Sequence, residues 1–348
     1  MFKKVLSFCA AAAMFLTAKS QDSTKGTTTF TTSVDAYYRY DFTGKFQGAN
    51  NKTCFTNSAN SFELGMASIK ADHSFGKVAA TADLGFGRRA EEFSYNDGTP
   101  NSKPTLAAIK QAYLSYAATS KIKFTAGKWA THVGWELVDG YANRNYSMAY
   151  AFNNGPFFHT GLKADIALFG KTALMIGVAN PTDFSTTDKD GKMFIAQLSS
   201  ATKNDKLKAY LNYQGGTNQL NQKISQFDLV LNYVPSTKFS AVYNGTIQNQ
   251  DGQTWGSNVL YLNYDPTSLF GLTLRNELFD DNKEIKLAAG SGAKILASTL
   301  SGNFRLSNLT IIPEIRFENS SNEASFLDKD AKGTKSAASF LLAVAYKF

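Results

Sequence analysis

The feature that most constrains the fold of this chain is an alternation of apolar and polar residues with a period of two, which recurs from about residue 28 to the C-terminus. In one such segment the apolar residues occupy every second position: Leu207, Ala209, Leu211 and Tyr213. Successive side chains of a β-strand point to opposite faces, so each segment would present one apolar and one polar face. A helical period describes these segments less well. The pattern therefore predicts an all-β chain.

Sixteen segments of this kind can be counted, and the connections between them alternate in length. The segments begin near residues 29, 60, 76, 105, 121, 157, 171, 192, 206, 222, 237, 254, 268, 293, 307 and 336. Tight turns are expected at 74–76, 119–120, 170–171, 204–205, 235–236, 266–268 and 307–308. Longer polar stretches are expected at 43–59, 90–104, 134–156, 181–191, 214–221, 249–253, 280–292 and 319–335. A transmembrane β-barrel has short turns on one side of the membrane and long loops on the other, whereas a soluble sandwich gives no reason for this alternation.

The number of segments also indicates whether the apolar faces point into the interior of the barrel or outward to lipid. About sixteen strands (14–18) enclose a lumen too wide to be filled by their own side chains, and no long apolar segment remains to fill it. The apolar faces are therefore expected to meet lipid around a water-filled interior. Aromatic residues near segment ends are expected to form interfacial girdles: Phe62, Phe86, Tyr213, Tyr233, Tyr264 and Phe279. We predict a single transmembrane antiparallel β-barrel in outer-membrane lipid, with long extracellular loops and short periplasmic turns.

Composition excludes several other classes of protein. Aromatic residues make up 13 % of the 348 residues, far more than a disordered chain carries. No stretch after residue 20 approaches the roughly 18 apolar residues that a spanning helix needs. The two cysteines, Cys9 and Cys54, are too few for a disulfide scaffold. The formal net charge of +8 is spread along the chain without a Lys/Arg cluster, so nucleic acid is not an expected partner.

The first twenty residues have the pattern of a cleaved export signal. Two lysines at positions 3 and 4 precede a mostly apolar run over 5–17, and small residues stand at 18 and 20. We expect residues 1–20 to be removed, so that the mature barrel comprises residues 21–348.

The other end of the chain carries an independent signal. The apolar residues on one face of the last segment are Phe340, Leu342, Val344, Tyr346 and the final residue, Phe348. A terminal Phe preceded by alternating apolar residues resembles the C-terminal signature of bacterial outer-membrane barrels, which the barrel-insertion machinery reads. The alternative is an ordinary edge strand of a soluble domain. We predict the outer membrane as the location and the insertion machinery as a partner through Phe348.

Several stretches are similar to the OmpL-like β-barrel porin family, which is common in Bacteroidetes. They read DAYYRYDF at 35–42, KQAYLSY at 110–116, TAGKWATHVG at 125–134, NRNYSM at 143–148 and GPFFHTG at 155–161. The similarity is densest over 105–185. The resemblance implies an outer-membrane barrel assigned as a porin, but it implies neither a defined substrate nor established functional residues.

The longest connection, 134–156, is the expected constriction. Loops of this length are usually functional, and a loop folded into a wide barrel narrows the pore. An extracellular cap packed on itself is the alternative. Charged residues on the loop and at inward strand positions are the candidates for the constriction: Glu136, Asp139, Arg144, Lys163, Asp165, Arg275, Glu277, Glu314 and Arg316. Asp35, Arg39 and Asp83 are further inward-facing candidates. Opposed charges across the constriction would filter small polar solutes by a transverse field.

We therefore predict a porin that lets small hydrophilic solutes and ions diffuse passively, without catalysis, cofactor or metal. One alternative is a hydrolase in a smaller barrel of ten to twelve strands, built on His132 and His159, although no GxSxG motif is present. Another is a closed structural or adhesive barrel. Porins of this size are often trimers, so a homotrimer is expected, although no segment marks an interface.

Two residues conflict with the predicted strands. Lys128 falls on the outward face, where a bulge or an interfacial position would be needed to avoid lipid. Pro313 lies within a clear strand and lacks the N–H that the ladder needs, so a bulge is expected there.

Overall fold

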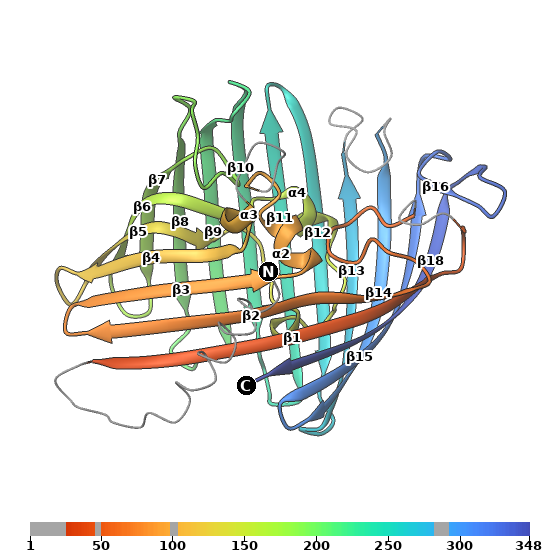
Figure 1. Cartoon of the computed structure of the whole chain (residues 1–348), viewed down its shortest axis with the longest axis horizontal. Coiled ribbons are helices and arrows are strands. Elements are labelled where there is room, and N and C mark those ends of the chain that lie inside the picture. The colour runs from red at the N-terminus through yellow and green to blue at the C-terminus, as the bar shows by residue number, and fades with distance from the viewer. Residues whose placement is uncertain (1–25, 46–49, 98–103, 282–291) are drawn as a thin grey trace, which may run out of the picture.

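A computed structural model of the chain describes residues 26–45, 50–97, 104–281 and 292–348. The expected export signal, residues 1–20, lies outside the described residues. Sixteen antiparallel strands form a closed barrel, in which successive strands are neighbours and the first pairs with the last (Figure 1). The predicted fold class is thus confirmed.

The barrel strands follow the predicted segments closely. They are β1 (Thr27–Asp41), β2 (Ser61–Phe75), β3 (Val78–Phe86), β4 (Ile109–Ala117), β5 (Ile122–Ala130), β6 (Phe158–Ala167), β7 (Ala173–Ala179), β8 (Met193–Ala201), β9 (Leu207–Thr217), β10 (Lys223–Tyr233), β11 (Phe239–Gln250), β12 (Gln253–Tyr264), β13 (Phe270–Asp280), β14 (Lys294–Leu306), β15 (Leu309–Ser320) and β18 (Ser336–Lys347). The connections contain a small hairpin, β16 (Phe326–Leu327) with β17 (Gly333–Thr334), and the short helical elements α2 (Arg88–Phe93), α3 (Pro104–Ala107), η2 (Gly140–Ala142) and α4 (Tyr150–Asn154). None of the helices in the described ranges is long and apolar enough to cross a membrane.

Closure of the barrel leaves no free sheet edge between β1 and β18. Their register runs from the pair Ser33–Lys347 to the pair Asp41–Ser339. Beyond it, the N–H of Phe348 donates to the carbonyl of Thr32 (2.9 Å), and the N–H of Thr32 donates to the carbonyl of Phe348 (2.8 Å). Backbone groups in lipid must be satisfied within the protein, and a closed ladder does this for every strand.

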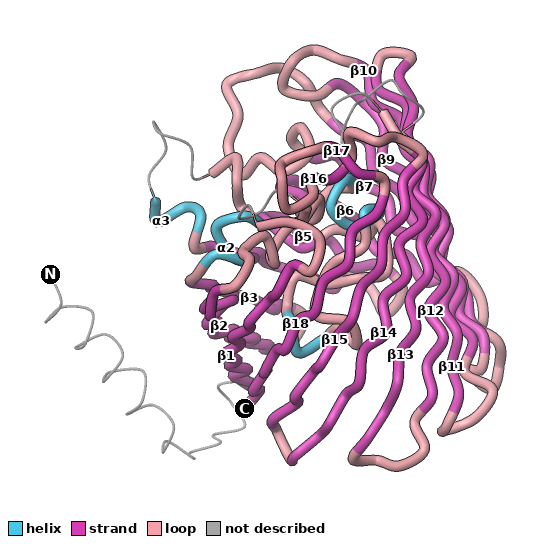
Figure 2. Tube along the Cα trace, turned by 90° about the vertical axis from the view of Figure 1, so that its right-hand side faces the viewer, coloured by secondary structure: helices cyan, strands magenta, loops and turns pink. Residues whose placement is uncertain are grey.

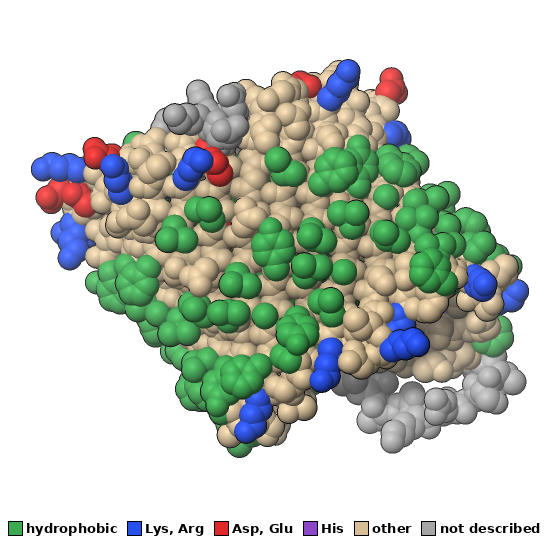
Figure 3. Space-filling view, turned by 180° about the vertical axis from the view of Figure 1, so that it is seen from behind, with side chains coloured by type: hydrophobic (Ala, Val, Ile, Leu, Met, Phe, Trp, Pro, Cys, Tyr) green, Lys and Arg blue, Asp and Glu red, His purple; other side chains and the backbone are tan. Residues whose placement is uncertain are grey.

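The outer wall is apolar. Figure 3 shows apolar side chains spread across one face of the barrel, with charged side chains gathered toward its two ends. Four of the predicted girdle residues are exposed on this outer wall: Phe62, Phe86, Tyr233 and Tyr264. The assignment of Phe279 to the girdle is wrong. Phe279 shares its face of β13 with Arg275 and Glu277, which point inward, and it is fully buried.

The two ends of the barrel differ as predicted, with two exceptions. Figure 2 shows the short turns at the lower end and the longer loops at the upper end. The stretches 214–221 and 249–253, predicted to be long, are short because the strands that flank them extend further. β11 and β12 are joined by Asp251 and Gly252 alone, both with positive φ (50° and 87°), as a two-residue hairpin turn of this hand requires.

Lys128 and Pro313 are accommodated without a shift in register. Lys128 lies near the extracellular end of β5, where the loop after α2 covers it, and its ammonium group donates to Ser94 and Asp97 (3.2 and 2.9 Å). Its position is therefore interfacial and shielded. The bulge predicted at Pro313 is wrong. The register of β15 is continuous on both sides, and the ladder to β14 is merely interrupted at residues 302–303 and 312–313.

Bulges occur instead at two positions where a loop enters the lumen. In β2, Gly65 is the extra residue between the pairs Asp35–Met66 and Ala36–Leu64. In β4, Lys110 is the extra residue opposite β3, and this turns its side chain inward. A bulge re-aims a side chain without breaking the sheet, so both serve the contacts described next.

Candidate functional site

The connection between β5 and β6, residues 131–157, is here called the lumen loop because it crosses the interior of the barrel. In the closed ring of strands, β13 lies eight strands from β5 in either direction, so β5 and β13 stand on opposite walls. The loop begins at β5, and its residues contact inward-facing side chains of β13. In Figure 1, α4 lies at the centre of the barrel, and α4 contacts β12 and β13.

The base of the lumen loop is held by the wall formed by β9 and β10. The N–H of Gly134 donates to Asp228 on β10 (3.1 Å), and Nε2–H of His132 donates to the carbonyl of Tyr213 on β9 (3.1 Å). Burial lowers the pKa of His132 to about 4, so its ring is neutral at physiological pH.

On the wall opposite β5, Arg275 of β13 holds the centre of the loop. Its guanidinium group donates to Glu136 (2.6 Å) and to the carbonyl of Ser147 (2.6 Å). Glu136 also accepts the N–H of Ala149 (2.8 Å). All of these groups are buried, so the charges of Glu136 and Arg275 neutralise each other away from water.

Glu277, two residues further along β13, binds the start of α4. Its two carboxylate oxygens accept the N–H groups of Tyr150 and Ala151 (2.7 Å each). The first N–H groups of a helix have no partner within the helix, and a carboxylate is a favourable acceptor for them. Glu277 therefore anchors this end of the loop.

β15 supplies three more charged side chains to the loop. Glu314 accepts the N–H of Tyr146 (3.0 Å), and Arg316 donates to the carbonyl of Met148 (2.8 Å). Glu318 pairs with Arg316 (2.9 Å) and accepts the hydroxyl of Tyr150 (2.7 Å). Because strand residues two apart share a face, all three side chains point into the lumen together.

β1 and α2 clamp Tyr146 from the other side of the loop. The hydroxyl of Tyr146 donates to Asp35 on β1, and its carbonyl accepts from Arg89 of α2 (3.1 Å). The guanidinium of Arg89 also lies over the ring of Tyr146, 4.5 Å from its centre. Gly65, the bulge residue of β2, leaves the space in which Tyr146 meets Asp35, since a Cβ at residue 65 would collide with both side chains.

Lys110 joins the loop to β3. Its ammonium group lies 3.1 Å from Asp83 on β3 and 2.6 Å from Asp139 on the loop. The bulge in β4 makes this contact possible, because regular alternation along the strand would turn the side chain of Lys110 toward lipid.

Apolar contacts complete the attachment of the loop. Ala149 and Ala151 pack against inward valines of three successive strands: Val230, Val242 and Val259. Aromatic residues from three loops form a second cluster, which includes Phe55, Phe93, Phe152 and Phe157. The loop is therefore held on the inward face by apolar contacts as well as by the charged and polar contacts described above.

Several charged groups that stay partly exposed in the lumen lie toward its periplasmic end. Arg144 of the loop pairs with Asp265 (2.9 Å), which also binds Arg305 (2.8 Å). On β6, Lys163 and Asp165 pair with each other (3.3 Å). These side chains keep between 20 and 32 % of their surface exposed.

The constriction residues predicted from the sequence thus divide into two groups. Five are buried in contacts between loop and wall: Glu136, Arg275, Glu277, Glu314 and Arg316. The other four are partly exposed: Asp139, Arg144, Lys163 and Asp165. The three further candidates point inward as expected and are buried: Asp35, Arg39 and Asp83.

Sequence reasoning missed several residues that hold the loop. Glu318 could have been found, because it continues the inward series of Glu314 and Arg316. Lys110 could not, because its bulge inverts the alternation, and nothing in the sequence marks Arg89 as a partner of the loop.

The two histidines of the hydrolase hypothesis do lie together. Their ring centres are 5.1 Å apart; His159 is buried and His132 is half-buried. Nε2 of His159 lies 3.1 Å from the hydroxyl of Thr131, while His132 is bound to a backbone carbonyl.

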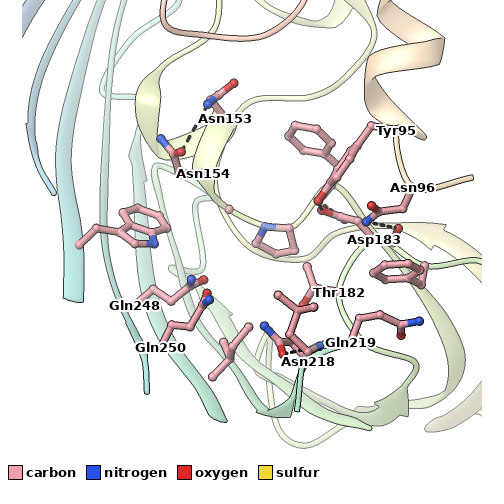
Figure 4. Close-up of a pocket in the computed structure, with 17 residues that line it drawn as sticks. Tyr95, Asn96, Asn153, Asn154, Thr182, Asp183, Asn218, Gln219, Gln248 and Gln250 are labelled. Carbon is pink, nitrogen blue, oxygen red and sulfur yellow. Dashed lines mark hydrogen bonds between the residues drawn. The ribbon is translucent and has the colours of Figure 1, made fainter. Parts of the chain in front are cut away.

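Of the cavities beside the lumen loop, two differ in the chemistry of their lining. The lower one, about 390 Å³, is lined by charged and polar residues that include Glu136, Arg144 and Asn212. The upper one, about 480 Å³, lies between the end of the lumen loop and the extracellular ends of β10–β12, and Figure 4 shows its lining.

These features define a wide outer-membrane β-barrel whose lumen is crossed by the loop 131–157. The sequence profile of the family described as "Putative beta-barrel porin-2, OmpL-like" matches residues 27–348, so the chain belongs to this porin family, and its place is the outer membrane. Among curated proteins, none matches the chain.

Solved structures of similar fold include an outer-membrane channel and an anion-selective porin. OprB of Pseudomonas putida has a TM-score of 0.66 at 10% identity, over 96% of this chain and 97% of that one. The outer membrane channel DcaP of Acinetobacter baumannii has a TM-score of 0.61 at 12% identity, over 93% and 98%. An anion-selective porin from Comamonas acidovorans has a TM-score of 0.58 at 12% identity, over 93% and 100%. At these identities the likeness concerns the fold.

Proposed function

We propose that this protein is a passive diffusion porin for small hydrophilic solutes and ions, in which the lumen loop sets the width of the pore. The observation that supports this most directly is the attachment of the loop to opposite walls, to Asp228 on β10 and to Asp35 on β1. A loop fixed on both sides narrows the path without closing the barrel at its rim. In this proposal the five buried charged residues hold the loop in place and do not filter solutes.

We further propose a preference for anions. In the periplasmic half of the lumen, inward-facing basic side chains outnumber inward-facing carboxylates. The carboxylates are Asp72, Asp165 and Asp265. The basic side chains are Lys70, Lys123, Arg144, Lys163, Lys208, Arg305 and Lys347. A lumen lined by one sign of charge concentrates the opposite ion. The fold is shared with an anion-selective porin, which is consistent with this preference.

The test is ion conductance in planar lipid bilayers, with reversal potentials in a KCl gradient. Discrete conductance steps with a reversal potential on the anion side are expected. A barrel that inserts but never conducts would instead be a closed structural barrel.

The proposal includes export through removal of residues 1–20, assembly as a homotrimer, and function without catalysis, cofactor or metal. N-terminal sequencing and the mass of the native complex in detergent test the first two. For the hydrolase alternative, the double variant His132→Gln/His159→Gln is assayed with lipid and peptide substrates, and an activity lost on substitution would favour the enzyme.

A further inference from the structure

The upper cavity has a lining of unusual chemistry. Side-chain amides come from four different segments of the chain and converge on it: Asn96, Asn153, Asn154, Asn218, Gln219, Gln248 and Gln250. Figure 4 shows Gln248 and Gln250 on one side of the cavity and Tyr95, Asn96 and Asp183 on the other. The lower cavity, by contrast, is lined by ionised groups such as Glu136 and Arg144.

Among the described residues, Asp183 supplies the only carboxyl group of this lining, and it already accepts hydrogen bonds from within the protein. Asp183 is buried, and one of its oxygens accepts the N–H groups of Phe157 and Phe158 (2.7 and 3.0 Å). Burial raises the pKa of Asp183 to about 7, and the hydroxyl of Tyr95 lies 3.3 Å from its second oxygen. The described lining therefore offers a ligand no charged group that lacks partners within the protein.

Several amides of the lining have hydrogen-bonding capacity to spare. Gln248 is 8 % exposed, and within the described parts of the chain its side chain has no hydrogen-bond partner. Asn153 makes only a long bond to Asn154 (3.4 Å). Each amide carries both donors and acceptors, so these side chains are free to bind a ligand that supplies both kinds of partner.

Apolar surfaces stand beside these amides. Tyr95 is 49 % exposed, and Pro156, Phe184 and Trp255 contribute to the same lining. The volume of about 480 Å³ lies within the range of roughly 300–1,000 Å³ that is usual for small-ligand sites.

We propose that the upper cavity is a binding site for neutral polyhydroxylated solutes, that is, short carbohydrates, which it captures at the extracellular entrance of the lumen. Each amide side chain carries a hydrogen-bond donor and an acceptor side by side. It can therefore bind two adjacent hydroxyl groups of a sugar, one of which donates while the other accepts. The aromatic and proline surfaces pack on the C–H faces of the ring. Charged solutes are disfavoured because nothing in the cavity compensates their loss of water. This inference rests on the proposed porin function, since it assigns the solute class of that pore.

The test uses the full mature barrel in planar bilayers, with maltotriose as the neutral probe and triglutamate as a charged probe of similar length. Maltotriose added on the extracellular side is expected to interrupt the ion current at millimolar concentration, and triglutamate is not. The variants Gln248→Ala and Asn153→Ala should each weaken this block by about five-fold, the effect of one hydrogen bond. Asn232→Ala, which truncates an inward amide near the periplasmic end of β10, is the matched control and should leave the block unchanged.

Calorimetric titration of the detergent-solubilised barrel with maltotriose runs in parallel and needs no open channel. Binding without conductance would support the site and overturn the proposed pore. Conductance steps without block or heat of binding would overturn the carbohydrate site and leave the pore intact. Equal weakening by Asn232→Ala would also overturn the assignment to the upper cavity.

Discussion

Glu136 on the lumen loop and Arg275 on β13 form a buried ion pair of 2.6 Å that joins opposite walls of the barrel through the loop. Arg275 also binds the backbone of the loop at Ser147, so one side chain fixes two parts of it. Removal of one partner leaves the other charge buried and uncompensated, which costs about 3–5 kcal/mol.

Arg275→Ala is therefore expected to release the centre of the lumen loop, raise the single-channel conductance and increase current noise. It should also lower the free energy of unfolding of the barrel in detergent by about 3–5 kcal/mol. Asn232→Ala serves as a control that should change neither quantity. Unaltered conductance in Arg275→Ala would argue against the loop as the constriction.

Arg144, Asp265 and Arg305 form a partly exposed cluster with an excess of positive charge. Arg144→Glu reverses that excess, so the reversal potential in a KCl gradient should move toward cations, and more so at low ionic strength. Arg144→Gln should give an intermediate value. If the reversal potential is the same in both variants as in the wild type, the residues that select ions lie elsewhere in the pore.

The depressed pKa of His132, about 4, predicts a dependence on pH. An unfolded histidine binds its proton near pH 6.5, so between pH 6.5 and 4 the unfolded chain holds more protons than the folded one. The contribution of His132 to the free energy of unfolding is therefore fully present above about pH 6.5. It is lost as the pH falls toward about 4, by up to about 1.4 kcal/mol per pH unit.

Thermal unfolding in detergent across this range measures the effect. The variant His132→Gln keeps a donor for the carbonyl of Tyr213 but does not titrate, so its profile should be flatter than that of the wild type. Identical profiles for the two proteins would show that His132 does not carry the dependence.

Phe348 links closure of the barrel to its assembly. The backbone of Phe348 bonds to Thr32, whereas its ring is exposed on the outside (56 %). Phe348→Ala keeps the backbone bonds, so the purified variant should refold in detergent like the wild type. In cells, the fraction that reaches the outer membrane in the heat-modifiable, folded form should fall several-fold. Normal assembly in cells would show that the insertion machinery does not read this residue.

The sequence by itself determined the barrel. Alternation along each segment, as in β9 with Leu207, Leu211 and Tyr213 outward, states which face meets lipid, because the pleat of a strand leaves no other choice. The number of segments and the inward position of Arg275, Glu277, Glu314 and Arg316 follow from the same rule. Phe279 was misplaced only because an aromatic residue near a strand end was taken for a girdle residue.

Only the tertiary structure decided what those inward residues do. The partners Glu136 and Arg275 are 139 residues apart, and no local pattern states that the loop after β5 packs against β13. The bulge that turns Lys110 inward arises from pairing with β3 and contradicts the local alternation. The amide cavity likewise gathers single residues from separate loops and strand ends. Such placements depend on long-range packing, and a period of two carries information about the faces of a strand but none about what fills the space that the strands enclose.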